Sequence, residues 1–223
     1  RLLSPSDYGV VGMVGIFFAI AQTFIDSGFG SALIRKNDCS DTDYSTAFYF
    51  NIIVGFVCCV ILSVLSPVIA NFFKTPILKD IIKVMSLNML ISSFVIVHGT
   101  KLTHSVDFKS QTLVGLIASI ISGVSGIILA YSGFGVWSLV LQHLIATILR
   151  GILLIWVTKW LPKREFSKES FQYLFNFGSK ILIASLLHTI YANMTTMIIG
   201  KFYSAKDLGY YSRGESLATY PSS

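Results

Sequence analysis

Residues 110–149 read SQTLVGLIASIISGVSGIILAYSGFGVWSLVLQHLIATIL, about 40 residues without an Asp, Glu, Lys or Arg. A helix crosses the hydrocarbon core of a bilayer with about 20 mostly apolar residues, so this run is long enough for two crossings. The tetrapeptide SGFG at residues 132–135 is a turn signal near its middle. The stretch therefore predicts two membrane helices, Gln111–Tyr131 and Gly135–Thr158, joined by a tight turn.

The rest of the chain follows the same pattern. Hydrophobic residues make up 53% of it and charged residues 13%, about half the share of charge in a soluble domain. Further apolar runs predict spans at Tyr8–Ile34, Tyr44–Phe73, Ile77–Thr100 and Phe177–Tyr203. The run at 77–100 begins with three charges, which leaves about 17 clean residues, near the lower limit for a span. We predict an all-α, polytopic membrane helix bundle with about six transmembrane helices.

Several kinds of site are disfavoured by the composition. The three cysteines, Cys39, Cys58 and Cys59, have no CxxC or Cys/His spacing, so we expect neither a disulfide framework nor a metal site. The net charge of +6 comes from Lys and Arg residues scattered between apolar runs, which does not resemble a nucleic-acid surface. We expect no cofactor and no nucleic-acid partner.

The basic residues between the spans predict an orientation. If the loop after Ile34 is cytoplasmic, that side holds more Lys and Arg than the other side, as the positive-inside rule requires. The residues on that side are Arg35, Lys36, Lys101, Lys109, Lys159, Lys163, Arg164 and Lys168. The longest loop, 159–176, then forms a cytoplasmic interfacial loop and helix, in which Ser167 caps the helix and Phe166 packs on Phe171.

Two similar octapeptides stand far apart in the chain, LLSPSDYG at 2–9 and FYSAKDLG at 202–209. At an offset of 200 the matching pairs are Ser4 and Ser204, Asp7 and Asp207, and Gly9 and Gly209. Six predicted spans separate the copies, and an even number returns the chain to the same side. The pattern predicts a parallel duplication with about 12 spans in the complete protein; the alternative is two unrelated but similar turns.

Five motifs follow one another in a characteristic order. They are RLLSPSDYG (1–9), DSGFGSALI (26–34), DFK (107–109), GFGVWSLVLQ (133–142) and IIGKFYSAKDLGYYSRGESLATYPS (198–222). Together they resemble the bacterial polysaccharide flippases of the multidrug/oligosaccharidyl-lipid/polysaccharide exporter superfamily. The resemblance implies two six-helix lobes around a V-shaped cavity, which turn a polyprenyl-pyrophosphate-linked sugar unit across the cytoplasmic membrane by alternating access.

The same resemblance implies a division of the chain. Residues 1–158 would be most of the N-terminal lobe without its first helix, 159–176 the cytoplasmic loop and helix, and 177–223 the start of the C-terminal lobe. The expected partners are the lipid-linked oligosaccharide, membrane lipids and the polysaccharide assembly machinery. The protein would be a multi-pass transporter of the bacterial inner membrane and not an enzyme.

A pyrophosphate needs a wet, cationic cavity, so polar groups inside the spans are the candidate site residues. His143, Thr147 and Arg150 form one stripe on the span at 135–158. Arg150 is the first candidate for a pyrophosphate contact, because a guanidinium makes paired hydrogen bonds to phosphate oxygens. The alternative is that Arg150 extends to lipid headgroups at the membrane surface.

Two other spans carry candidates. Lys180 and His188 share a polar face on the span at 177–203; contact with headgroups and simple packing are their respective alternatives. Asp26, with Gln22 one turn earlier, is a candidate for binding a coupling proton or cation, and its alternative roles are a helix cap or a pair with Arg35.

Two other functions remain open. A cation-coupled drug exporter of the same superfamily would favour acidic cavity residues, whereas the charges within these spans are mostly basic. A membrane enzyme could use His98, His104, His143 or His188, but the chain has no HExxH motif and no paired carboxylates.

Overall fold

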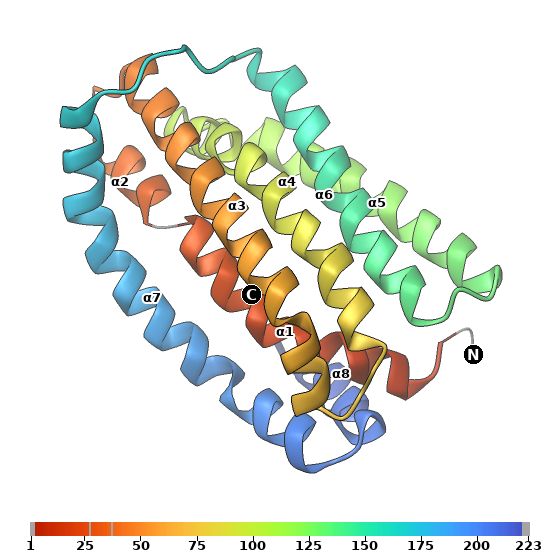
Figure 1. Cartoon of the computed structure of the whole chain (residues 1–223). Coiled ribbons are helices and arrows are strands. Elements are labelled where there is room, and N and C mark those ends of the chain that lie inside the picture. The colour runs from red at the N-terminus through yellow and green to blue at the C-terminus, as the bar shows by residue number, and fades with distance from the viewer. Residues whose placement is uncertain (1–2, 27, 37, 220–223) are drawn as a thin grey trace.

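The residues described by the computed structural model are 3–26, 28–36 and 38–219, and they form eight α-helices and no strand (Figure 1). In chain order the helices are α1 (Pro5–Asp26), α2 (Phe29–Arg35), α3 (Asp41–Phe72), α4 (Leu78–His104), α5 (Phe108–Tyr131), α6 (Val136–Thr158), α7 (Lys168–Phe202) and α8 (Ala205–Thr219).

Six segments of these helices are long and apolar enough to cross a membrane. They are Pro5–Arg35, Asp41–Phe72, Leu78–His104, Phe108–Tyr131, Val136–Thr158 and Lys168–Phe202. Each contains one of the predicted spans or closely coincides with it, so the prediction of an all-α polytopic membrane bundle is confirmed.

The helices pack both with their neighbours in the chain and with distant helices, among them α1 with α8. The antiparallel pairs α3–α4 and α5–α6 lie side by side, with α4 against α6, while α7 runs along the opposite edge next to α1 (Figure 1). Small residues bring α3 and α4 together: Gly55 faces Ser93, and the Ser63 and Ser86 hydroxyls are 2.8 Å apart. Packing and hydrogen bonds of this kind hold helices together in lipid, where apolar burial between helices supplies little.

The first predicted span is interrupted near Gly28. This residue has a left-handed backbone with φ of 68°, and a Cβ there would overlap the backbone of Gly178 on α7. Only glycine fits both the conformation and the close approach. The break separates α1 from α2 and lets α7 pack directly on the chain at this point.

The predicted interfacial helix is part of a longer helix. Ser167 caps it, since its Oγ accepts a hydrogen bond from the Ser170 N–H at 3.2 Å, and the Phe166 and Phe171 rings lie 5.8 Å apart. However, the helix that begins at Lys168 continues without a break to Phe202. The segment 168–176 is therefore not a separate helix, because no proline or left-handed residue interrupts the turns that follow it.

The described parts of the two octapeptides, 3–9 and 202–209, share one hydrogen-bonded turn and contact each other. In the first, the Asp7 carboxylate accepts from the Ser4 hydroxyl at 2.8 Å; in the second, Asp207 accepts from Ser204 at 2.6 Å. A Cβ on Gly9 would overlap the Ala205 carbonyl.

The contact is reciprocal, because a Cβ on Gly209 would overlap the Pro5 carbonyl, and positions 5 and 205 are equivalent at the offset of 200. Equivalent residues exchange contacts in this way around a local two-fold axis. A Cβ at Gly12 would lie 4.0 Å from the Cβ of Ser212, its own equivalent, which places the axis near this pair.

Candidate functional site

A cavity of about 610 Å³ lies between α1, α4, α5 and α6. Four of the seven predicted site residues line it: Gln22 and Asp26 from α1, and Thr147 and Arg150 from α6. Residues of two candidate groups on separate helices, the coupling pair of α1 and part of the polar stripe of α6, thus line one cavity. The packing of α6 against α4, and of α4 against α1, positions them.

Arg150 is the cation of this cavity. Its side chain is exposed, and no described residue forms an ion pair or hydrogen bond with it. Thr147 is turned back on its own helix, where its hydroxyl donates to the His143 carbonyl at 3.1 Å. The guanidinium therefore keeps its donors available for a ligand in the cavity.

Asp26 is the anion of the same cavity. Its carboxylate accepts a hydrogen bond from the Gln22 amide at 3.1 Å. Arg35, the partner considered from the sequence, instead lies over the Phe177 ring, 4.6 Å from its centroid. The cavity thus contains one acidic group, Asp26, and one basic group, Arg150, and neither forms an ion pair with a described residue.

Part of the polar lining was missed in the sequence. Ser92, Thr100 and Thr103 reach the cavity from α4, and Gln111 reaches it from α5. The Thr103 hydroxyl lies 3.4 Å from the Gln111 side-chain oxygen. The α4 residues are spaced by 8 and 3 positions, so they share one helical face, and this spacing was the signal available.

Three predicted residues lie elsewhere. His143 is exposed on α6 but does not line this cavity, and Lys180 and His188 are exposed on α7 outside it. The α7 helix contacts α1 close to His188 through the Thr23 and Thr189 hydroxyls, which are 3.0 Å apart. Lys180 and His188 thus do not join the four residues gathered in the cavity.

A second cavity of about 520 Å³ lies between α1, α5, α6 and α8. Tyr8, Gly126, Gln142 and Arg213 are part of its lining. Arg213 stacks on Tyr8 with its guanidinium carbon 3.6 Å from the ring centroid. The sequence reading did not select Arg213, because it belongs to no polar stripe and was quoted only as part of a motif.

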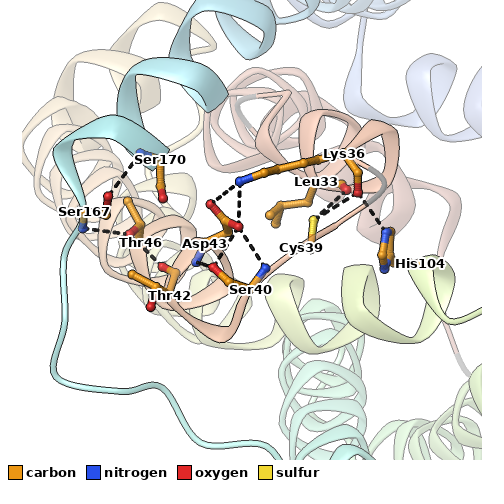
Figure 2. A network of polar contacts seen from close by, with 10 residues as sticks. All are labelled: Leu33, Lys36, Cys39, Ser40, Thr42, Asp43, Thr46, His104, Ser167 and Ser170. Carbon is orange, nitrogen blue, oxygen red and sulfur yellow. Dashed lines mark hydrogen bonds and ion pairs between the residues drawn. The ribbon is translucent and has the colours of Figure 1, made fainter.

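A dense polar network surrounds the start of α3 (Figure 2). The Asp43 side chain is 2% exposed; its two oxygens accept from the Lys36 ammonium at 2.7 Å, and one also accepts from the Ser40 N–H at 2.9 Å. Cys39 donates to the Leu33 carbonyl at 3.1 Å, and burial raises the pKa of its thiol. These contacts form a capping box and tie α2 to α3.

The same network holds the linker 159–167, which joins α6 to α7. The Lys163 N–H donates to Ser45 at 2.9 Å, the Ser167 N–H donates to Thr46 at 3.1 Å, and the Trp160 indole N–H donates to Asp41 at 3.2 Å. Each partner lies in the first two turns of α3. The network accordingly has a structural role.

Two histidines of the enzyme alternative also have structural partners. His98 Nδ1 lies 2.9 Å from the Thr158 hydroxyl, and His104 Nε2 lies 3.1 Å from the Lys36 carbonyl. Within the described ranges, no three His, Cys, Asp or Glu side chains are grouped so that they could hold a metal ion.

Known proteins resemble the chain over its whole length. A sequence model of a family described as "Polysaccharide biosynthesis protein" matches residues 1–223. The teichuronic acid biosynthesis protein TuaB of Bacillus subtilis (strain 168) is 27% identical over 203 residues, which are 90% of this chain and 42% of TuaB. The succinoglycan biosynthesis transport protein ExoT of Rhizobium meliloti (strain 1021) is 23% identical over 99% of this chain and 45% of its own length.

A third relative is the lipopolysaccharide biosynthesis protein WzxC of Escherichia coli (strain K12), 22% identical over 99% of this chain and 45% of WzxC. The chain thus spans under half the length of each of these relatives. No solved structure gives a significant match. With its six long apolar helices, the chain belongs to the polysaccharide biosynthesis protein family and is a multi-pass bacterial membrane protein.

Proposed function

We propose that the complete protein flips a polyprenyl-pyrophosphate-linked oligosaccharide across the cytoplasmic membrane by alternating access. The observation that carries this proposal is the unpaired Arg150 in a cavity inside an otherwise apolar helix bundle. The names of TuaB, ExoT and WzxC refer to teichuronic acid biosynthesis, succinoglycan biosynthesis transport and lipopolysaccharide biosynthesis, which favours this class of substrate.

The energetics of Arg150 support a role in binding. A charged side chain within a span costs about 2.5–3.5 kcal/mol on insertion scales, and such residues usually serve a ligand or a path. Among the described residues, Arg150 has no partner that would offset this cost. A pyrophosphate would offset it through paired, charge-assisted hydrogen bonds. The lining hydroxyls of Thr100 and Thr103 donate to the Ile96 and Gly99 carbonyls of their own helix, which leaves Arg150 as the main donor to this anion.

Asp26 provides a site for energy coupling. The carboxylate shares the cavity with Arg150, so binding of a proton or cation at Asp26 changes the field that the pyrophosphate experiences. Gln22 fixes the carboxylate by its hydrogen bond. We assign Asp26 and Gln22 to coupling and Arg150 to the substrate; Thr147, whose hydroxyl donates to the His143 carbonyl, lines the cavity beside Arg150.

The local two-fold axis supports two lobes. Residues 1–158 would belong to the first lobe, and 177–223 would begin the second. The reciprocal packing of Gly9 and Gly209 would be the contact between the lobes. Lys180 and His188 on the exposed face of α7, and His143 on α6, would then meet lipid headgroups or the path between the lobes.

A drug exporter is the second candidate, because Asp26 gives the cavity an acidic group. The two functions differ in their phenotype. Deletion of the full-length gene should remove the surface polysaccharide and leave the complete lipid-linked unit on the cytoplasmic leaflet. Unchanged polysaccharide together with new drug sensitivity would instead indicate an exporter, and loss of a glycan-processing product would indicate an enzyme.

A further inference from the structure

The second cavity contains a cationic group that the proposed function does not use. We infer that Arg213, with Tyr8 and Gln142, forms a second binding site for the phosphate group of a lipid-linked anion. This inference rests on the proposed function and adds a second position along the path of the same substrate.

The position of Arg213 leaves its donors free. The guanidinium carbon lies 3.6 Å from the centroid of the Tyr8 ring, so the cation is stacked on the aromatic face. Stacking uses the flat face of a guanidinium, whereas its N–H groups point outward in the plane. The Tyr8 ring therefore fixes the cation and leaves the edge that recognises a phosphate available.

The surroundings of Arg213 suit an amphipathic ligand. The Gln142 amide lines the cavity opposite a helix that presents Ile127 and Ala130, and Leu139 is a further apolar wall. The described lining contains no carboxylate that would neutralise Arg213. A cavity with one cation, two neutral polar groups and apolar walls fits a phosphate attached to a hydrocarbon chain better than a drug cation.

The two cavities lie along the same helices. On α5, Gly115 and Ser119 line the first cavity and Gly123 and Gly126 line the second. These positions are separated by three or four residues, so they form one face of the helix. No described atom lies within 4 Å of a Cβ placed at Gly115 or Gly123, which shows that these glycines border open space and do not pack against a neighbouring helix.

The α6 helix continues this path. Gln142 lines the second cavity and Arg150 lines the first, eight positions later, which corresponds to about 12 Å along a helix. A phosphate would bind Arg150 at one depth in the membrane and Arg213 at another depth. On α5, Gly115 and Gly123 leave room for the passage between these two depths, whereas the Gln142 side chain packs on Gly126.

The inference is tested by binding of farnesyl pyrophosphate to the purified full-length protein in detergent. An Arg150→Gln background isolates the second site. In that background, Arg213→Gln should lower the affinity about tenfold or more, because a charge-assisted hydrogen bond is lost. Lys206→Gln is the matched control, since Lys206 is a basic residue on the same helix that lines neither cavity.

Two further variants separate recognition from folding. Arg213→Lys keeps the charge but loses the paired donors, and it should retain an intermediate affinity. The Tyr8→Phe variant should bind farnesyl pyrophosphate as tightly as the protein with Tyr8 does. The Tyr8→Leu variant should bind it about two- to fivefold more weakly, because the stacked ring is removed. Equal affinity in Tyr8→Leu and Tyr8→Phe would contradict the stacking role.

The outcomes distinguish this site from the proposed function. If Arg213→Gln binds as tightly as Lys206→Gln while Arg150→Gln alone reduces binding, the second site is wrong and the proposed function stands. If the unchanged protein does not bind farnesyl pyrophosphate, both fail. Farnesol should not bind, and inorganic pyrophosphate binding as tightly as farnesyl pyrophosphate would assign the site to a free anion and overturn the lipid-linked source.

Discussion

Charged side chains are used in opposite ways at the start of α3 and in the cavity of Arg150. Around α3, Lys36 and Asp43 pair at 2.7 Å, and Lys101 and Asp41 pair at 3.3 Å. In the cavity, Arg150 has no ion-pair partner among the described residues. Paired charges therefore hold helices of the bundle together, whereas we expect the unpaired Arg150 to bind a ligand.

The largest effect should come from breaking the buried pair at α3. Asp43→Asn leaves the Lys36 ammonium without its counter-ion; because the Lys36 side chain is 30% exposed, the cost should lie below the value of about 3–5 kcal/mol for a fully buried pair. We expect the loss in the free energy of unfolding of the detergent-purified protein, measured by thermal or denaturant unfolding. Since Asp43 also caps α3, a stability equal to that of the unchanged protein would show that the network is not structural.

Arg150→Ala should impair transport and leave the stability of the protein unchanged. Transport of lipid-linked sugar should fall about tenfold or more, since hydrogen bonds to a charged group contribute about 1.5–3 kcal/mol. The melting temperature should not fall, because Arg150 pairs with none of the residues that the structure describes. Arg150→Lys should retain partial transport, and Lys109→Ala, an exposed basic residue at the start of α5, is the control. Surface polysaccharide at the normal level in an Arg150→Ala strain would defeat the assignment.

Asp26→Asn should have a smaller effect on transport. It keeps the hydrogen-bonding shape beside Gln22 but removes the charge. We expect a reduced dependence of transport on the proton or cation gradient, with substrate affinity retained. The measurement is uptake into vesicles with and without an imposed gradient. If the variant responds to the gradient as the unchanged protein does, Asp26 is not the coupling residue.

The smallest effect is expected at the exposed edge of the α3 network. The Asp41 side chain is 44% exposed, and its contacts with Lys101 and Lys163 are 3.3 and 3.7 Å long. Exposed pairs of this kind contribute about 0.2–1 kcal/mol. Asp41→Asn should therefore destabilise the protein by less than Asp43→Asn does; an equal loss would mean that burial does not distinguish the two pairs.

The fold was predictable from the lengths of apolar runs, because a bilayer imposes a nearly fixed helix length. The break at Gly28 and the unbroken α7 were not predictable. The break at Gly28 depends on the close approach of Gly178, a residue 150 positions away in the sequence. The unbroken α7 depends on helical turns that continue through Phe177.

The site was predictable only in parts. Helical spacing identified the face on which Arg150 lies, but spacing cannot show which helix packs opposite that face. The same reasoning selected Lys180 and His188, which lie outside the cavity on α7. Arg213 was missed because its significance comes from stacking on Tyr8, a contact between opposite ends of the chain.

The most direct measurement is flipping of a lipid-linked oligosaccharide by the full-length protein reconstituted in liposomes, with Arg150→Ala compared with Lys109→Ala. The account predicts that Arg150→Ala inserts and folds normally but flips at about a tenth or less of the rate of Lys109→Ala, as expected for loss of a charge-assisted phosphate contact. Equal rates for the two variants would contradict the claim that the unpaired arginine binds the pyrophosphate.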